Sequence, residues 1–159
     1  MAIRDSCSKR TEPTRGFRQQ RVTHKSFDYE MLEVGGSFQK YWHRYIPNAQ
    51  ALIFVVGTQE GANPIDCLAE AGATLAQFLR DHVPSWWPVV ILVNDKDHAN
   101  SGQSITRQAA RHALSLEGTD AMQRIHLEIF VCSAAAQAPE SAHALACPLD
   151  WLAARLADD

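Results

Sequence analysis

The sequence predicts an α/β fold with a doubly wound, mostly parallel sheet. Two continuous apolar runs, at residues 51–56 and 89–93, suit strands that are covered by helices on both faces. Between them, residues 64–82 carry apolar side chains at spacings of three and four, the pattern of an amphipathic helix. Strands that alternate with helices of this length favour parallel pairing through crossover connections.

The other elements follow in chain order. Residues 18–26 and 27–34 alternate polar and apolar side chains and predict a β-hairpin, with Phe27, Tyr29 and Met31 on one face. A short helix is expected next, before the strand at 51–56. Helix 64–82 begins at Asn63 or Pro64, and a strand follows at 89–93. Residues 103–116 and 148–157 are predicted helices, and 126–132 a strand. The apolar face of helix 64–82 is expected to contain Ile65, Leu68, Ala71, Leu75, Phe78 and Leu79.

Composition narrows the class of protein. The chain has 159 residues, 46% hydrophobic and 21% charged, as expected for one globular domain and not for collagen, a coiled coil or a disordered protein. The apolar run at 51–56 is far too short to span a bilayer. The four cysteines form no C-x-x-C pair, and the seven histidines form no H-E-x-x-H motif. The sequence therefore shows no sign of a metal-binding motif. We expect a cytoplasmic protein.

Charge is unevenly distributed along the chain. The net charge is −3, yet residues 1–25 contain seven Lys or Arg side chains against two acidic ones. Such a segment could touch phosphates, nucleic acid or an anionic membrane. The alternative, which we favour, is a solvated and disordered leader at residues 1–10, followed by the folded domain at 11–159. We expect no nucleic-acid partner. Residue 2 is alanine and the sequence ends in L-A-D-D, which fit neither the myristoylation nor the prenylation pattern, so we expect any membrane contact to be indirect.

Short motifs follow the predicted strands, at the edge where open α/β sheets bind ligands. E-V-G-G-S at 33–37 follows the second strand, N-D-K-D at 94–97 the fourth, and C-S-A-A at 132–135 the fifth; T-E-P-T-R-G-F at 11–17 precedes them. In this order they resemble the nucleotide-binding loops of small GTPases, specifically those of the Arf-like (ADP-ribosylation factor-like) family, in its divergent V-G-G-S form. The resemblance extends from about residue 11 to the C-terminus.

The resemblance implies a role for each motif. Thr14 and Glu33 would hold Mg²⁺, the Gly36 amide would sense the γ-phosphate, and Asn94 would read guanine. An aromatic effector surface would include Phe17 and Tyr45, with Leu32 at the family's third aromatic position; burial of these side chains in the core is the competing interpretation. GTP or GDP with Mg²⁺ are the implied cofactors. The implied nucleotide-binding set is Thr14, Gly36, Asn94, Asp97, Ser133 and Ala134.

The departures from the family pattern affect the chemistry. Ser37 replaces the glutamine that orients the attacking water, so we expect slow or absent hydrolysis and assign no catalytic residue. Glu33 replaces an aspartate, and Asp95 replaces the lysine of N-K-x-D. No G-x-x-x-x-G-K-[ST] phosphate loop occurs in the 159 residues. Losing its charge-assisted hydrogen bonds costs about 5–10 kcal/mol, so nucleotide binding is expected to be weak or absent.

The missing phosphate loop also affects the expected fold. The first strand, the phosphate loop and the first helix of the family are absent from it. Three explanations are open. Strand 27–34 could pair directly with 51–56, another chain could supply a strand, or the natural protein could be longer; we favour the last. The leading hypothesis is an Arf-like regulatory switch in membrane or ciliary trafficking, with protein effectors or regulators as partners and guanine nucleotide if the phosphate loop is restored. The alternative is a nucleotide-independent pseudo-GTPase scaffold.

Overall fold

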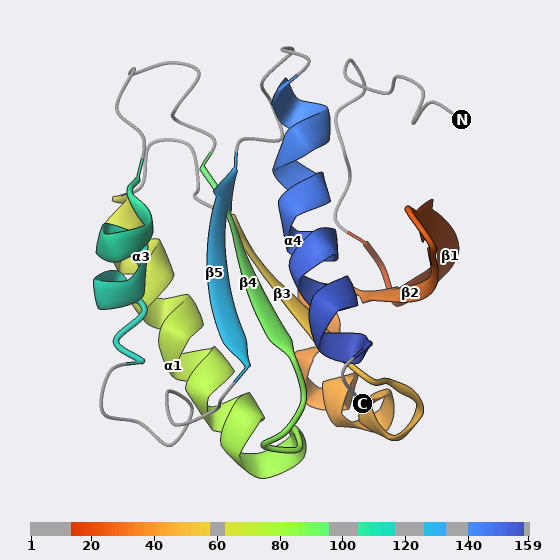
Figure 1. The fold of residues 1–159 in the computed structure, drawn as a ribbon. Helices are drawn as coiled ribbons and strands as arrows, with labels where there is room; N and C mark the ends of the chain where they lie inside the picture. The colour runs from red at the N-terminus through yellow and green to blue at the C-terminus, as the bar shows by residue number, and fades with distance from the viewer. Residues whose placement is uncertain (1–13, 58–62, 96–104, 117–125, 133–139, 158–159) are drawn as a thin grey trace. The chain divides into compact units, whose positions relative to one another are not determined.

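The chain divides into two units, Met1–Tyr45 and Ile46–Asp159 (Figure 1). The computed structural model describes residues 14–57, 63–95, 105–116, 126–132 and 140–157, without the side chains of 140–145. The leader expected at residues 1–10 lies outside these ranges, and the expected domain boundary stays a prediction. Each unit is described below by itself.

The first unit contains a β-hairpin. Strands β1 (Phe17–His24) and β2 (Phe27–Val34) pair antiparallel, in a register that places Phe17 opposite Val34 and His24 opposite Phe27. Lys25 in the turn has a φ of 53°, in the left-handed region. Along β2, Tyr29 and Met31 are half-buried and their neighbours are exposed. The hairpin prediction is confirmed, and β2 has the predicted bounds.

The expected short helix is of the 3-10 type. Element η1 (Gly36–Arg44) follows β2 in the first unit, and the three-residue η2 (Ile46–Asn48) opens the second unit. Phe38 inside η1 has non-helical angles (φ −100°, ψ 18°), and its N–H donates to the Gly35 carbonyl over 2.9 Å. The segment is therefore two short turns joined at a kink.

The second unit is built on a parallel sheet. Strands β3 (Leu52–Gly57), β4 (Val89–Asn94) and β5 (Leu127–Cys132) lie in the order β3-β4-β5. Helices α1 (Pro64–His82) and α3 (Arg107–Ala113) cover one face, and α4 (Glu140–Leu156) covers the other (Figure 1). The first five residues of β4 are buried, as the continuous apolar run predicted. The predicted doubly wound α/β class is confirmed.

Helix α1 has the predicted bounds and forms much of the core. The Asn63 side chain caps it by accepting a hydrogen bond from the Ile65 N–H over 3.0 Å, and Pro64 occupies the first turn. Ile65 is 45% exposed, so its predicted place on the apolar face is wrong. Helical side chains tilt toward the N-terminus, and one in the first turn points past the end of the helix. The buried helix residues are Leu68, Gly72, Leu75, Phe78 and Leu79.

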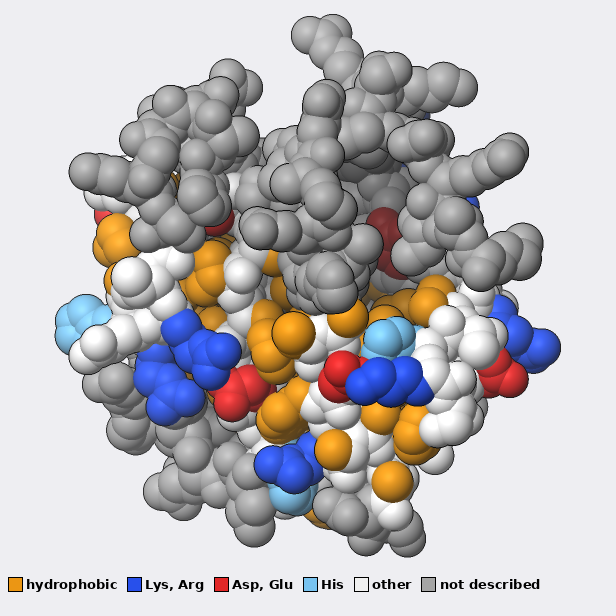
Figure 2. Space-filling model, turned by 45° about the horizontal axis from the view of Figure 1, so that its top comes forward, with side chains coloured by type: hydrophobic (Ala, Val, Ile, Leu, Met, Phe, Trp, Pro, Cys, Tyr) orange, Lys and Arg blue, Asp and Glu red, His pale blue; other side chains and the backbone are white. Residues whose placement is uncertain are grey.

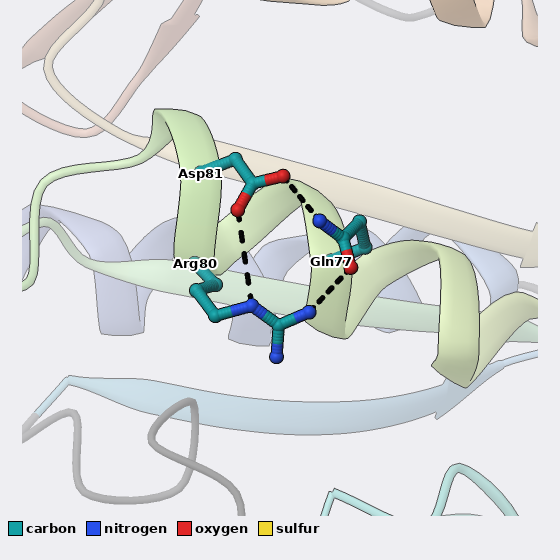
Figure 3. Close-up of polar contacts among 3 residues, drawn as sticks. All are labelled: Gln77, Arg80 and Asp81. Atoms are coloured by element: carbon teal, nitrogen blue, oxygen red, sulfur yellow. Dashed lines mark hydrogen bonds and ion pairs between the residues drawn. The ribbon is translucent and has the colours of Figure 1, made fainter.

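The exposed end of α1 has a small polar network (Figure 3). The Arg80 guanidinium donates to the Gln77 side-chain carbonyl, and the Gln77 amide donates to the Asp81 carboxylate. Arg80 Nε also lies 3.8 Å from Asp81 Oδ1. Pairs of this kind on an exposed helix surface contribute at most about 1 kcal/mol each.

Helices α3 and α4 differ from their predicted bounds. Thr106 caps α3 by accepting a hydrogen bond from the Ala109 N–H over 3.1 Å, and part of the predicted range 103–116 lies outside the described residues. Helix α4 begins at Glu140, whereas the sequence predicted a start at residue 148. Pro148 therefore lies inside α4. Proline usually marks a first turn, but the preceding alanine-rich residues favour helix strongly enough to continue through it.

No described helix is both long enough and apolar enough to cross a membrane.

Candidate functional site

The segment before β1 is joined to the end of β2. The Thr14 hydroxyl donates a hydrogen bond to Oε1 of Glu33, 19 residues away in the sequence. Close by, the Gly35 N–H donates to the Gly16 carbonyl over 2.9 Å. The structure therefore brings together the two residues that the sequence predicted as Mg²⁺ ligands, and it does so through a direct side-chain contact.

Gly35 permits this close approach because it has no side chain. A Cβ atom at Gly35 would lie 2.0 Å from the carbonyl oxygen of Thr14, far inside van der Waals contact. Gly16 has a φ of 93°, a conformation that favours glycine. The G-G pair in the sequence suggested a phosphate contact at Gly36, but it did not reveal this backbone packing at Gly35.

The oxygen atoms at this point suit a magnesium ion. Hydroxyl and carboxylate oxygens are hard donors, and Mg²⁺ in nucleotide sites is held by one or two protein oxygens together with phosphates and water. No group of three or more His, Cys, Asp or Glu side chains that could hold a metal occurs among the described residues. The Thr14 hydroxyl and the Glu33 carboxylate are donors of the chemical type that Mg²⁺ prefers.

The backbone after β2 is held by a tryptophan. Gly36 opens η1, and the Trp42 indole N–H donates to the Gly35 carbonyl over 3.2 Å. A Cβ atom at Gly36 would meet nothing within 4 Å, so space remains beside this residue. The sequence did not predict this contact between Trp42 and the G-G pair.

The predicted base-reading residues belong to the second unit. Asn94 ends β4 and lies beside Cys132, the last residue of β5, in the parallel register. Burial raises the pKa of the Cys132 thiol above its ordinary value. The ends of these two strands are therefore adjacent, as the α/β prediction required. Three further predicted site residues, Asp97, Ser133 and Ala134, lie outside the described residues.

Asp95 is buried and holds the ends of a loop. It is only 2% exposed, and its carboxylate Oδ2 accepts a hydrogen bond from the Ile105 N–H over 2.9 Å. Its own N–H donates to the Cys132 carbonyl over 2.8 Å. A lysine in the family pattern has a long side chain, whereas this short carboxylate connects β4 to the residues before α3. The sequence marked Asp95 only as a departure from N-K-x-D.

The predicted effector residues are in contact. The rings of Phe17 and Tyr45 have centroids 5.8 Å apart and planes inclined at 49°. Phe17 is 59% exposed, so its ring is not buried in a core, and Leu32 is also exposed. The hairpin register places Phe17 and Leu32 on the same face of the hairpin. Figure 2 shows how hydrophobic side chains reach the surface among charged ones on the described part of one face.

Comparison with known proteins decides the family. A model of the ADP-ribosylation factor family matches residues 2–156. The chain belongs to the ADP-ribosylation factor family. The resemblance inferred from the strand-end motifs is therefore confirmed.

Two relatives of this Arf family chain have similar alignments. ADP-ribosylation factor-like protein 1 of Caenorhabditis elegans is 28% identical over 148 residues, which cover 92% of this chain and 74% of that protein. ADP-ribosylation factor-like protein 1 of Drosophila melanogaster is 28% identical over 144 residues, which cover 89% of this chain and 72% of that protein.

A solved structure has the same fold. The Arl6 BBS3 small GTPase from Trypanosoma brucei, with the bound nucleotide analogue GppNp, matches with a TM-score of 0.64 at 15% identity. The match covers 93% of this chain and 86% of that one. The parallel sheet and its helices therefore have the same fold as that protein.

Proposed function

We propose that this Arf family protein is a cytoplasmic regulator of membrane or ciliary trafficking that acts by binding protein effectors or regulators. Family membership supports the regulatory role. The contact between the exposed Phe17 ring and Tyr45 supports partner binding through the first unit, because aromatic side chains dominate the energetics of many protein interfaces. This contact is the observation that carries the proposal.

The nucleotide contacts in this proposal are those that the sequence motifs imply. Thr14 and Glu33 hold Mg²⁺, the Gly36 amide contacts the γ-phosphate, and Asn94 with Asp97 binds guanine, aided by the backbone at Ser133 and Ala134. When bound, Mg²⁺ supplies charge that neutralises the phosphates. The mutual contact of Thr14 and Glu33 supports the metal-binding part. The adjacent ends of β4 and β5 support the base-binding part.

Affinity for nucleotide is proposed to be weak in a polypeptide of these 159 residues. They contain no G-x-x-x-x-G-K-[ST] sequence to surround the phosphates with amides and a lysine. A deficit of about 5–10 kcal/mol reduces a nanomolar site to micromolar affinity or weaker, since each factor of ten corresponds to about 1.4 kcal/mol. Ser37 in place of the water-orienting glutamine makes hydrolysis slow as well.

Equilibrium dialysis with labelled GTP and GDP, with and without Mg²⁺, tests this affinity. We expect dissociation constants of about micromolar or weaker for the 159-residue polypeptide. Submicromolar binding that depends on Mg²⁺ and is lost in Glu33→Ala would contradict the weak-binding proposal and support a working switch. Arg80→Ala, on the exposed end of α1, is the control and should leave the binding curve unchanged.

A second candidate function is a scaffold that does not need nucleotide. The absence of a G-x-x-x-x-G-K-[ST] sequence from these 159 residues favours it. The scaffold predicts that saturating GTP and Mg²⁺ leave the melting temperature unchanged. A ligand present at 100 times its dissociation constant would instead add about 2.7 kcal/mol of stability. Differential scanning calorimetry, with Mg²⁺ alone as the reference, distinguishes these results.

A further inference from the structure

The exposed Phe17 ring and the half-buried Tyr45 ring of the first unit belong to a part of the chain that is rich in basic residues. We define the basic–aromatic surface by its apolar and its basic side chains, which are Phe17, Leu32 and Tyr45, and Arg21, Lys40 and Arg44. The hairpin register places Arg21 on the same face as Phe17 and Leu32. Arg44 ends η1 and directly precedes Tyr45. Phe17, Leu32 and Arg21 therefore share one hairpin face, and the Phe17 ring contacts Tyr45 in the segment that also carries Lys40 and Arg44.

The basic side chains outnumber the acidic ones in this part of the chain. Residues 14–45 contain six Lys or Arg against three Asp or Glu, and all three carboxylates accept hydrogen bonds from neutral donors. Thr14 donates to Glu33, Gln19 to Glu30 and Thr23 to Asp28. Glu30 lies directly opposite Arg21 in the register but is bonded to Gln19. Each of these carboxylates is thus hydrogen-bonded to an uncharged side chain.

Two of the cations are held close to the same ring. Lys40 Nζ and Arg44 Cζ each lie 4.9 Å from the ring centroid of Tyr41. In the part of the chain that the structure describes, neither forms an ion pair with a carboxylate, and neither does Arg21. A ring face attracts a cation but does not cancel its charge. An approaching carboxylate would therefore relieve repulsion between two like charges.

We propose that the basic–aromatic surface binds an acidic segment of a protein partner that also carries an aromatic or aliphatic side chain. This inference rests on the proposed effector role of Phe17 and Tyr45 and adds the chemistry of the partner. The apolar side chain contacts Phe17 and Tyr45, and the carboxylates lie against Lys40, Arg44 and Arg21. Charge complementarity sets the choice of partner and the rate of encounter, whereas burial of the rings supplies much of the affinity.

Selection from a random library of peptides of about 12 residues, displayed on phage and presented to the immobilised 159-residue protein, tests the proposal. We expect the enriched peptides to combine Asp or Glu with Phe, Tyr, Trp or Leu. The most enriched peptide is then synthesised and its affinity measured by fluorescence anisotropy. The affinity should fall at least about tenfold in Lys40→Gln/Arg44→Gln and on raising salt from about 0.05 to 0.5 M.

The control removes the same charge elsewhere. Arg80→Gln/Arg107→Gln likewise loses two positive charges, from side chains that are 54% and 58% exposed in the second unit. Its peptide affinity should stay within about twofold of the parent protein. Circular dichroism on every variant confirms that the fold is retained.

The outcomes separate this inference from the proposed function. Enriched peptides that are neutral or basic but lose binding in Phe17→Ala would overturn the acidic partner and leave the effector surface in place. Failure to enrich any peptide, or binding unaffected by Phe17→Ala, would overturn both. The last experiment measures binding to phosphatidylserine vesicles. If the protein binds these vesicles more tightly than the best peptide, and Lys40→Gln/Arg44→Gln loses this binding, the surface is assigned to a membrane and the proposal is contradicted.

Discussion

Replacing Gly72 by alanine is expected to destabilise the protein by about 2–3 kcal/mol, although alanine is the better helix former. Gly72 is buried in α1, and a Cβ atom there would lie 2.1 Å from the carbonyl oxygen of Leu114 and 2.9 Å from its Cα. Both are backbone atoms, so no side chain can move aside. Helix α1 and the turn after α3 must separate, which loosens contacts of Leu75 and Leu79 as well.

Thermal unfolding followed by circular dichroism measures this effect, which should lower the melting temperature by about 5–10 °C. Gly36→Ala is the matched control, because a Cβ atom at Gly36 meets nothing within 4 Å. It should unfold within about 0.5 kcal/mol of the parent protein. If Gly72→Ala raised the melting temperature instead, the close packing of α1 on Leu114 would be wrong.

Asp95→Lys, which matches the N-K-x-D pattern, is expected to cost about 3–5 kcal/mol of stability. Asp95 is 2% exposed, so a lysine there buries an ammonium group and removes the acceptor of the Ile105 N–H. The long side chain also needs volume that the short carboxylate does not. The substitution that imitates the family motif should therefore disrupt this chain.

Urea unfolding of a short series tests the reason for the loss. Asp95→Asn keeps an oxygen acceptor of similar shape and should cost about 1–2 kcal/mol. Asp81→Lys, on the exposed end of α1, makes the same change of charge at the surface and should cost less than about 1 kcal/mol. Equal losses at Asp95 and Asp81 would show that net charge, and not burial, governs the effect.

Much of the fold could be predicted because its signals are local. Asn63 and Pro64 mark the start of α1, its apolar spacing marks the buried face, and the continuous run 89–93 predicts a strand covered on both sides. The start of α4 could not be predicted, because proline is favoured in a first turn and disfavoured in a helix interior, so the local signal at Pro148 indicated the wrong boundary. Only the packed structure distinguishes the two.

The candidate site was predictable in part. The strand-end motifs predicted that Thr14 and Glu33 serve one ion, and the structure brings their side chains into contact. The motifs could not predict that the Thr14 carbonyl packs closely against Gly35, because that contact depends on the path of the chain between distant residues. The burial of Asp95 was equally hidden, since an aspartate after a strand is ordinarily exposed.

The short sequence separations within the hairpin have a consequence for the order of folding. Strands β1 and β2 meet through the Lys25 turn, and the bond between Thr14 and Glu33 spans only 19 residues. Pairing β3 with β4 instead requires all of α1 to be placed between them. Contacts between residues near in sequence lose less chain entropy and form faster. The hairpin should therefore take shape before the parallel sheet, and the Phe17–Tyr45 contact should form before the core of the second unit is complete.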